Sequence, residues 1–449
     1  MKGKNPKKQD FYTIPEYEKW SESLSSQDRK RWRIQYYKGL GTSSDKEAKE
    51  YFSNLAKHRI DFVYKDSKDD EAIDLVFNKK KADDRKQWLQ GYEPGSFLDT
   101  SSGRVRYKNF IDDEFRLFSI EDNKRSIPSL VDGLKPGQRK ILYSCFKRNL
   151  TQVVKVAQLS GYVSEHSAYH HGENSLQTTI IAMAQNFVGS NNINLLYPSG
   201  QFGSRREGGK DAASARYTFT KLCNVTRKLF VKEDDPLLNY LEDDGTPIEP
   251  DYYVPVIPMV LVNGSEGIGT GWSTTVPNYN PFDIIKNLRR MLDGEEPHEM
   301  VPWYRGFLGT IEQKDGNKSS YKISGVHEWQ DEVTLHISEL PVGSWTQSYK
   351  EFLEKHLVGS AAPKMTEFVM DYNDNSTPFI VDFTVSVASD MVTKHYFHKS
   401  FHILSNSEKR FLSSRRRDWT RVSSFPRVLP HLTWYCSIPR ARSKSTTAC

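Results

Sequence analysis

Apolar residues recur at helical spacing in several stretches of the chain, and each such stretch predicts a helix. The predicted helices cover residues 110–120, 136–146, 153–159, 174–187 and 282–292. Their inward positions are Ile111, Phe115 and Phe118 in the first, Ile141, Leu142, Cys145 and Phe146 in the second, and Leu176, Ile180, Met183 and Phe187 in the fourth. Pro136 suits a first helical turn, because proline lacks the N–H that has no helical partner there.

Other patterns predict strands and helix caps. The predicted strands are 32–37, 254–262, 321–324 and 332–340. Ser43 or Ser44 is expected to cap a helix that runs through Glu47 to Leu55, with Glu47 near the third helical position. Residues 61–91 carry many charges and a few apolar anchors, Phe77, Trp88 and Leu89, and predict helical linker segments packed on another part of the chain.

The order of the elements indicates the fold class. Three short helices between 136 and 187 precede a glycine-punctuated ribbon at 192–206, the order of a winged helix-turn-helix. In such units the last helix enters the DNA major groove. Residues 280–385 alternate helix-like and strand-like stretches and predict a mixed α/β module. The chain is therefore expected to be an α+β multidomain protein.

Composition excludes several classes. The chain of 449 residues is 37% hydrophobic and 12% aromatic, which supports folded domains rather than disorder. It has no apolar run of 18 residues, so we expect no membrane span. Its four cysteines are too few for a disulfide framework and too widely spaced for a zinc module.

Charge is distributed unevenly. The net charge is +6, yet residues 401–449 hold ten Lys/Arg against two Asp/Glu, a net of +8 that leaves the first 400 residues at −2. A nucleic-acid surface on this body would have to come from local clustering of charge. Arg415–Arg417 could form a nuclear or nucleic-acid patch.

One stretch, 203–220, combines small residues with basic ones. Its glycines permit close backbone approach to a ligand, and its Arg and Lys residues suit phosphate. It ends in Arg216–Tyr217, where a phenol beside a guanidinium could attack phosphorus. The plainer interpretation is a solvated basic loop followed by a strand.

Three further segments have two interpretations each. Lys38, between aromatic residues and two glycines, either approaches a phosphate or lies in a solvated turn. His170 and His171 most simply form a capped helix end; as adjacent residues without nearby ligands they make a weak metal site. Ile268, flanked by glycines, is either a core plug or an apolar wedge that enters a DNA base step.

These segments together resemble eukaryotic type IIA DNA topoisomerase (topoisomerase II), continuously from about residue 11 to 385. The resemblance is carried by YYKGLGT at 36–42, KKKADDRK at 79–86, RSIPSLVDGLKPGQRK at 125–140, SAYHHGE at 167–173, AQNFVGSNNINLL at 184–196, GGKDAASARY at 208–217 and EGIGTGW at 266–272.

The resemblance implies a role for each candidate residue. Tyr217 would attack a backbone phosphorus to give a 5′-phosphotyrosyl link, Arg216 would hold the scissile phosphate, and His171 would lie near the tyrosine. DNA-binding roles would fall to Arg125, Asp132, Lys135, Arg139, Lys38 and Ile268, the last as the wedge that bends the duplex. No metal ligand is expected in this chain.

The resemblance also implies a domain layout. It assigns 1–60 to the C-terminal part of a TOPRIM domain, 61–115 to a helical linker, 116–257 to a winged-helix domain with the nucleophilic tyrosine, 258–386 to a tower domain and 387–449 to an atypical basic tail. Beyond about residue 386 the sequence no longer resembles the family, and we expect that tail to be poorly structured.

The complete enzyme of this family is a nuclear homodimer that acts on double-stranded DNA, hydrolyses ATP and uses Mg²⁺. The residues that bind ATP and Mg²⁺ are expected outside this chain, so the chain alone should bind duplex DNA but cleave it poorly. Two alternatives stay open: a catalytically inactive DNA-binding or scaffold module, and, less favoured, a tyrosine recombinase, which would form a 3′-phosphotyrosyl link.

Overall fold

The computed structural model describes residues 9–11, 14–29, 31–32, 34, 43–100, 102–243, 245–314, 317–359, 367–388 and 406–410. These residues divide between two compact units, Met1–Asn123 with Gly269–Trp272, and Lys124–Ile268 with Ser273–Cys449. Lys38 and most of the strand predicted at 32–37 lie outside the described residues.

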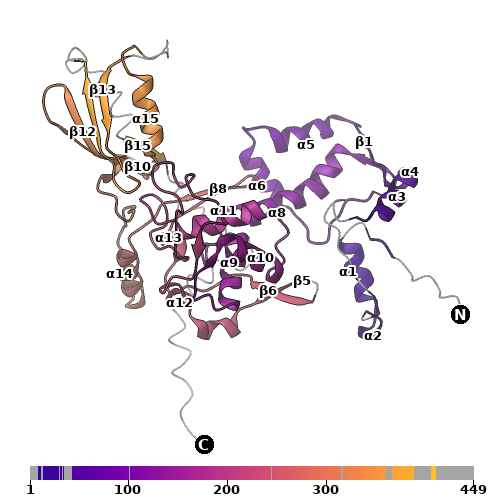
Figure 1. Cartoon of the computed structure of the whole chain (residues 1–449). Coiled ribbons are helices and arrows are strands. Elements are labelled where there is room, and N and C mark those ends of the chain that lie inside the picture. Colours follow the sequence, from indigo (N-terminus) through magenta and orange to yellow (C-terminus); the bar gives the residue numbers. More distant parts are fainter. Residues whose placement is uncertain are drawn as a thin grey trace, which may run out of the picture. The chain divides into compact units, whose positions relative to one another are not determined.

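The first unit is mainly helical (Figure 1). Its elements are α1 (Ile14–Glu22), α2 (Ser26–Arg29), α3 (Asp45–Ser53), α4 (Leu55–His58), β1 (Asp61–Val63), α5 (Ser67–Phe77), α6 (Ala82–Gln90), β2 (Arg104–Arg106), α7 (Tyr107–Asn109), a π-helical segment (Phe110–Phe115) and α8 (Arg116–Ser126). The predicted cap is confirmed, because Ser44 and Glu47 form a reciprocal capping box at the start of α3.

The segment predicted as a linker has its own small core. Ala72, Val76, Trp88, Leu89 and Ile111 are buried together. Two predicted anchors are wrong: Phe77 and Phe118 are exposed. For Phe118 the cause is the π-helical segment before α8, whose wider turn changes the phase of the helix and rotates later positions away from the face of Ile111.

The second unit contains the remaining elements. They are α9 (Pro136–Lys147), β3 (Val154–Lys155), α10 (Val156–His166), α11 (Glu173–Ala184), β4 (Phe219–Thr220), α12 (Thr226–Leu229), a 3₁₀ helix (Lys232–Leu237), β5 (Tyr240–Asp243), β6 (Thr246–Pro250), α13 (Met259–Val262), β7 (Ser265–Ile268), β8 (Ser273–Val276), α14 (Pro281–Leu292), β9 (Thr310–Lys314), β10 (Asn317–Ser324), β11 (Val326–Trp329), β12 (Thr334–Glu339), α15 (Thr346–Lys355), β13 (Val369–Asp374), β14 (Phe383–Val387) and β15 (Asn406–Arg410).

Helices α9, α10 and α11 form the centre of the largest core. The predicted positions Ile141, Leu142 and Cys145 of α9 are fully buried, as are Leu176 and Ile180 of α11. Two predicted boundaries are wrong: α10 begins at 156 and continues to 166, and α11 ends at 184. Phe187 therefore lies beyond the helix, where its ring contacts the edge of Trp345.

The chain after α11 is less regular than predicted. The ribbon expected at 192–206 makes isolated bridges to the segment after Tyr217, Leu196 with Leu222 and Ser199 with Phe219. The strand predicted at 254–262 is absent, and its last residues form α13 instead. Proline explains this, because Pro255 and Pro258 cannot donate to a strand ladder, whereas proline is well suited to precede a helix.

Two sheets follow. The larger has the order β11-β12-β14-β13, all antiparallel, and α15 packs on one of its faces (Figure 1). Buried and half-exposed residues alternate along β12 and β14, as in a sheet with one covered face. The smaller has the order β15-β10-β9. Its strand β15 lies within 387–449, the segment predicted to be poorly structured.

None of the helices among the described residues is both long and apolar enough to cross a membrane.

Candidate functional site

The loop that leads to Tyr217 is tightly built, not a solvated basic loop. The Asp211 carboxylate accepts hydrogen bonds from the backbone N–H of Ser204 (2.8 Å) and from its hydroxyl (2.6 Å). The N–H of Gly209 donates to the carbonyl of Ser204 at 2.8 Å. The side-chain amide of Gln185 donates to the carbonyls of Phe202 and Gly209. These bonds close residues 202–211 into a compact turn.

Glycine is required at three positions of this turn. Gly203, Gly208 and Gly209 all have positive φ. An added Cβ on Gly203 would lie 2.5 Å from the carbonyl oxygen of Gly209. On Gly208 it would lie 2.3 Å from the ring of Trp345, and on Gly209 it would lie 2.3 Å from the side-chain amide of Gln185. The partners that impose these contacts, Gln185 and Trp345, were not singled out from the sequence, because both are remote from the loop and carry no local pattern.

Tyr217 is presented by backbone bonds on both sides of it. The N–H of Ala157 donates to the carbonyl of Ala215 (3.1 Å), and the N–H of Val156 donates to the carbonyl of Thr218 (3.0 Å). Both residues that flank the Arg216–Tyr217 pair are buried, whereas the Tyr217 side chain is 69% exposed. The start of α10 therefore holds the chain so that the phenol projects into solvent.

Arg216 lies beside Tyr217. Its side chain is exposed, and its guanidinium carbon is 5.9 Å from the centre of the Tyr217 ring. This distance suits a cation–π contact. Of the predicted catalytic residues, the structure thus brings these two together, with a cation next to the phenol and both accessible to a ligand.

His171 lies in the turn between α10 and α11. It is exposed, and its ring meets the edge of Tyr169 at 5.4 Å. The turn begins at Ala168, whose φ of 48° is unusual for a residue other than glycine. The half-buried Lys140 pairs with the buried Glu249 at 2.8 Å, and its ammonium also donates to the carbonyl of Ser167, which stabilises this bend.

Asp132 and Arg139 form a buried ion pair. The carboxylate accepts from Nε (2.8 Å) and Nη2 (3.0 Å) of Arg139 and also from the backbone N–H of Leu134 and Tyr253. Asp132 is fully buried and Arg139 is 6% exposed. The prediction that their side chains bind DNA directly does not agree with this geometry: they shape the turn before α9, where Lys135 is half-buried at the surface.

Arg125 and Ile268 are both exposed. Arg125 lies in the last turn of α8. Ile268 ends β7 and is 77% exposed, which excludes the core-plug alternative. A Cβ on the preceding Gly267 would lie 2.3 Å from the carbonyl oxygen of Ser126, so the strand packs closely on the chain just where Ile268 points outward.

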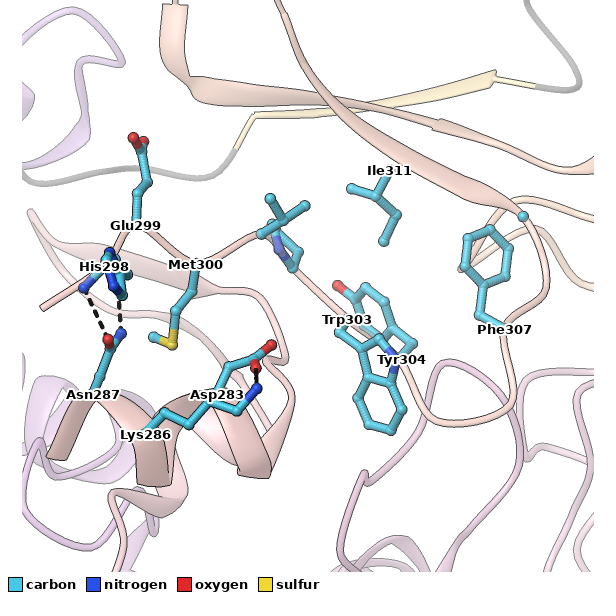
Figure 2. Close-up of a pocket in the computed structure, with 13 residues that line it drawn as sticks. Asp283, Lys286, Asn287, His298, Glu299, Met300, Trp303, Tyr304, Phe307 and Ile311 are labelled. Carbon is cyan, nitrogen blue, oxygen red and sulfur yellow. Dashed lines mark hydrogen bonds and ion pairs between the residues drawn. The ribbon is translucent and has the colours of Figure 1, made fainter. Parts of the chain in front are cut away.

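A pocket of about 540 Å³ lies between α14 and residues 298–311 (Figure 2). Its polar groups pair with each other: Lys286 with Asp283 at 3.2 Å, and Asn287 with both backbone groups of His298 at 2.8 Å. Met300, Trp303 and Ile311 form its apolar wall. None of the predicted site residues lines it.

No three His, Cys, Asp or Glu side chains gather in a metal-binding arrangement within the part of the chain that the structure describes.

Comparison with known proteins agrees with the predicted family. A family profile described as the A subunit of DNA gyrase/topoisomerase IV matches residues 125–413, and one described as the C-terminal associated domain of TOPRIM matches 1–123. The first match continues past residue 386, where we had expected the resemblance to end.

Individual relatives are similar over most of this chain. DNA topoisomerase 2 of Arabidopsis thaliana is 56% identical over 383 residues, which are 85% of this chain and 26% of the relative. DNA topoisomerase 2-alpha of Mus musculus is 49% identical over 419 residues, 90% of this chain and 27% of the relative. The chain thus spans about a quarter of the length of these curated relatives.

A solved structure shows the same fold. The crystal structure of the Plasmodium falciparum topoisomerase II DNA-binding, cleavage and re-ligation domain superimposes with a TM-score of 0.75 at 45% identity, covering 96% of this chain and 60% of that one. The chain therefore belongs to the type IIA DNA topoisomerase family, and the part of the family that it matches is the DNA breakage–reunion region of eukaryotic topoisomerase II.

Proposed function

We propose that this chain cuts and rejoins duplex DNA through Tyr217, as the breakage–reunion region of a type II topoisomerase. The observation that carries the proposal is the presentation of the Tyr217 phenol, exposed and beside Arg216, on a loop whose neighbouring residues are buried. A nucleophile held in this way needs little reorganisation to meet a phosphate.

The chemical step is an exchange of one phosphate ester for another. The phenolic oxygen bonds to the backbone phosphorus, the bond from phosphorus to the 3′ oxygen breaks, and the 3′ oxygen leaves with a proton as a hydroxyl. The phenol gives up its own proton, so the charge of the phosphodiester is unchanged. The reverse reaction reseals the strand, because a phenolate is less basic than an alkoxide and is therefore a competent leaving group when the 3′ hydroxyl attacks.

Side chains around Tyr217 have supporting roles in this proposal. Arg216 holds the scissile phosphate and neutralises charge that builds on its oxygens. His171 lies near the reacting groups and moves a proton. Arg125 and Lys135 bind the backbone of the cut strand, and Ile268 enters a base step and bends the duplex. Lys38 completes the set of DNA contacts.

We extend the proposal to the protein of which this region is a part. It would be a nuclear homodimer that passes one duplex through another and so takes part in chromosome segregation, with ATP and Mg²⁺ bound outside this chain. Residues 116–257 would form its winged-helix domain and residues 258–386 its tower. The length of the relatives, about four times that of the matching segment, supports a longer protein with further activities.

A trapping experiment tests the nucleophile. Supercoiled plasmid is incubated with the chain and Mg²⁺, denatured with detergent, and analysed for protein joined to the 5′ ends of broken strands. Because the chain alone is expected to cleave poorly, we expect a low but measurable yield of 5′ adduct from the natural chain and none from Tyr217→Phe, while Tyr197→Phe, at another exposed tyrosine, keeps the natural yield. No adduct in any of the three would favour an inactive DNA-binding module, and a 3′ adduct a recombinase.

A further inference from the structure

The far end of the Tyr217 loop is attached to the sheet module formed by β11–β14 and α15. The turn between β12 and α15, residues 339–347, meets the loop at three places. Arg205 reaches Glu339, the ring of Trp345 covers Gly208, and the backbone N–H of Gln347 donates to the carbonyl of Arg206 at 2.9 Å.

The first of these contacts is a buried ion pair. Nη2 of Arg205 lies 2.6 Å from Oε1 of Glu339, and the two side chains are 5% and 2% exposed. Glu339 also accepts hydrogen bonds from the backbone N–H of Leu340 (2.9 Å) and Leu308 (3.2 Å), which fix the carboxylate in place. The guanidinium is thus buried and paired through Nη2 with the sheet module, and it is not available to a phosphate.

The second contact leaves no free space. The Trp345 ring fills the position that a side chain at residue 208 would occupy, and it makes an edge-to-face contact with Phe187, with 5.9 Å between the ring centres. Gly208 and Trp345 are half-buried, and a close-packed contact of this kind has one favourable arrangement and does not deform gradually. The loop therefore takes its position from the 339–347 turn at one end and from the start of α10 at the other.

We infer that Arg205, Glu339 and Trp345 are positioning residues for Tyr217: they hold the nucleophile loop to the sheet module without touching DNA. This inference rests on the proposed function for its effect on chemistry. It predicts that loosening the attachment slows attack by the tyrosine and leaves DNA affinity nearly unchanged, because an ångström of misplacement costs up to roughly 100-fold in rate.

Two variants break the attachment by different means. Glu339→Gln removes the charge that pairs with Arg205, and Gly208→Ala introduces a methyl group 2.3 Å from the Trp345 ring without changing any charge. Arg205→Lys is the conservative variant: the bonds that the guanidinium makes to Glu339 and Leu340 both come from Nη2, so an ammonium can replace them. Asp382→Asn is the control, since that carboxylate pairs with His336 on the same sheet.

The first readout is peptide-resolved hydrogen exchange of the whole chain. We expect residues 203–214 to exchange about tenfold faster in Glu339→Gln and Gly208→Ala, and as in the natural chain in Asp382→Asn and Arg205→Lys. Unchanged exchange of the loop in both disrupting variants would overturn the inference, whatever the result with DNA.

The second readout is the single-turnover rate of the Tyr217–DNA adduct at saturating DNA, together with the DNA Kd. We expect the rate to fall about 10- to 100-fold in the two disrupting variants, with Kd changed less than about threefold, and Arg205→Lys to retain most of the rate. Faster exchange with an unchanged rate would overturn the inference. No adduct from the natural chain would instead refute the proposed function, and exchange alone would then decide whether the loop is anchored as inferred.

Discussion

Three arginines of the second unit, Arg139, Arg205 and Arg216, divide into two classes that their sequence does not distinguish. Arg139 and Arg205 are buried against carboxylates, whereas Arg216 is exposed beside the phenol. Burying a guanidinium is tolerable only with a partner in good geometry, which Asp132 and Glu339 supply. Only the exposed class is free to bind a phosphate, so the buried class supports the site and does not line it.

The Asp132–Arg139 pair gives a test of that division. In Asp132→Asn the buried guanidinium loses its counter-charge, and we expect the free energy of unfolding to fall by about 3–5 kcal/mol, measured by urea denaturation. Lys135→Ala, at the adjacent surface, should change it by less than about 0.5 kcal/mol while weakening DNA binding. A stable Asp132→Asn protein with weakened DNA binding would mean that the carboxylate acts at the DNA surface.

At the scale of secondary-structure elements, the exposed candidate residues Ile268 and Tyr217 lie on a short hairpin and a loop. Packing against neighbouring segments holds this hairpin and this loop in place. Strands β7 and β8 pair from Ser265 with Val276 to Ile268 with Ser273, so Ile268 lies where the hairpin turns. Gly267 permits the close contact of that strand with Ser126. Similarly, α10 and the 339–347 turn hold the Tyr217 loop. In both cases close backbone packing directs one exposed side chain outward.

The exposed position of Ile268 predicts that its substitution changes the shape of the bound DNA but not the stability of the protein. We expect Ile268→Ala to leave the melting temperature unchanged, because the side chain is mostly exposed, and to reduce the bend of a duplex labelled with fluorophores at both ends. Bending costs on the order of 1–6 kcal/mol, which the proposed wedge would help to offset. Leu241→Ala, an exposed leucine on β5, is the control. An equal bend with Ile268→Ala would refute the wedge.

At the scale of the whole molecule, the two compact units have separate sources of stability. In the first unit, Asp69 at the start of α5 is fully buried. It accepts from the backbone N–H of Lys108 and Lys65, both at 2.9 Å or less, and from Arg106. Burial alone would raise the pKa of this carboxyl, but these donors outweigh it and hold the pKa well below its ordinary value.

The lowered pKa of Asp69 predicts that the stability of the first unit falls at acid pH. A carboxylate with a folded pKa below its unfolded value of 3.8 stabilises the fold above that pH, and the contribution is lost as pH falls toward the folded pKa. Asp69→Asn should therefore be less stable than the natural chain at pH 7, and the difference should narrow below about pH 4. Hydrogen exchange of residues 67–90 measures this difference in stability between the two proteins. A difference that does not change with pH would contradict the lowered pKa of Asp69.

The helical parts of the fold could be predicted because their signals are local. Helix α9 with Pro136, the Ser44 cap and the buried positions of α11 follow from residues a few places apart in the chain. Two features do not follow from simple periodicity. The π-helical segment leaves Phe118 exposed, and the prolines near residue 258 give α13 in place of a strand. The family, too, follows from contiguous motifs.

The sequence by itself therefore determined the family and the main helices and predicted Arg216–Tyr217 as the reacting pair, since each is recorded in neighbouring residues. Only the tertiary structure decided which basic residues are exposed and what holds the Tyr217 loop. Arg205 and Glu339 are 134 residues apart, yet 2.6 Å separates their charged atoms. Burial and ion pairing depend on contacts between remote segments, and those contacts exist only once the chain has folded.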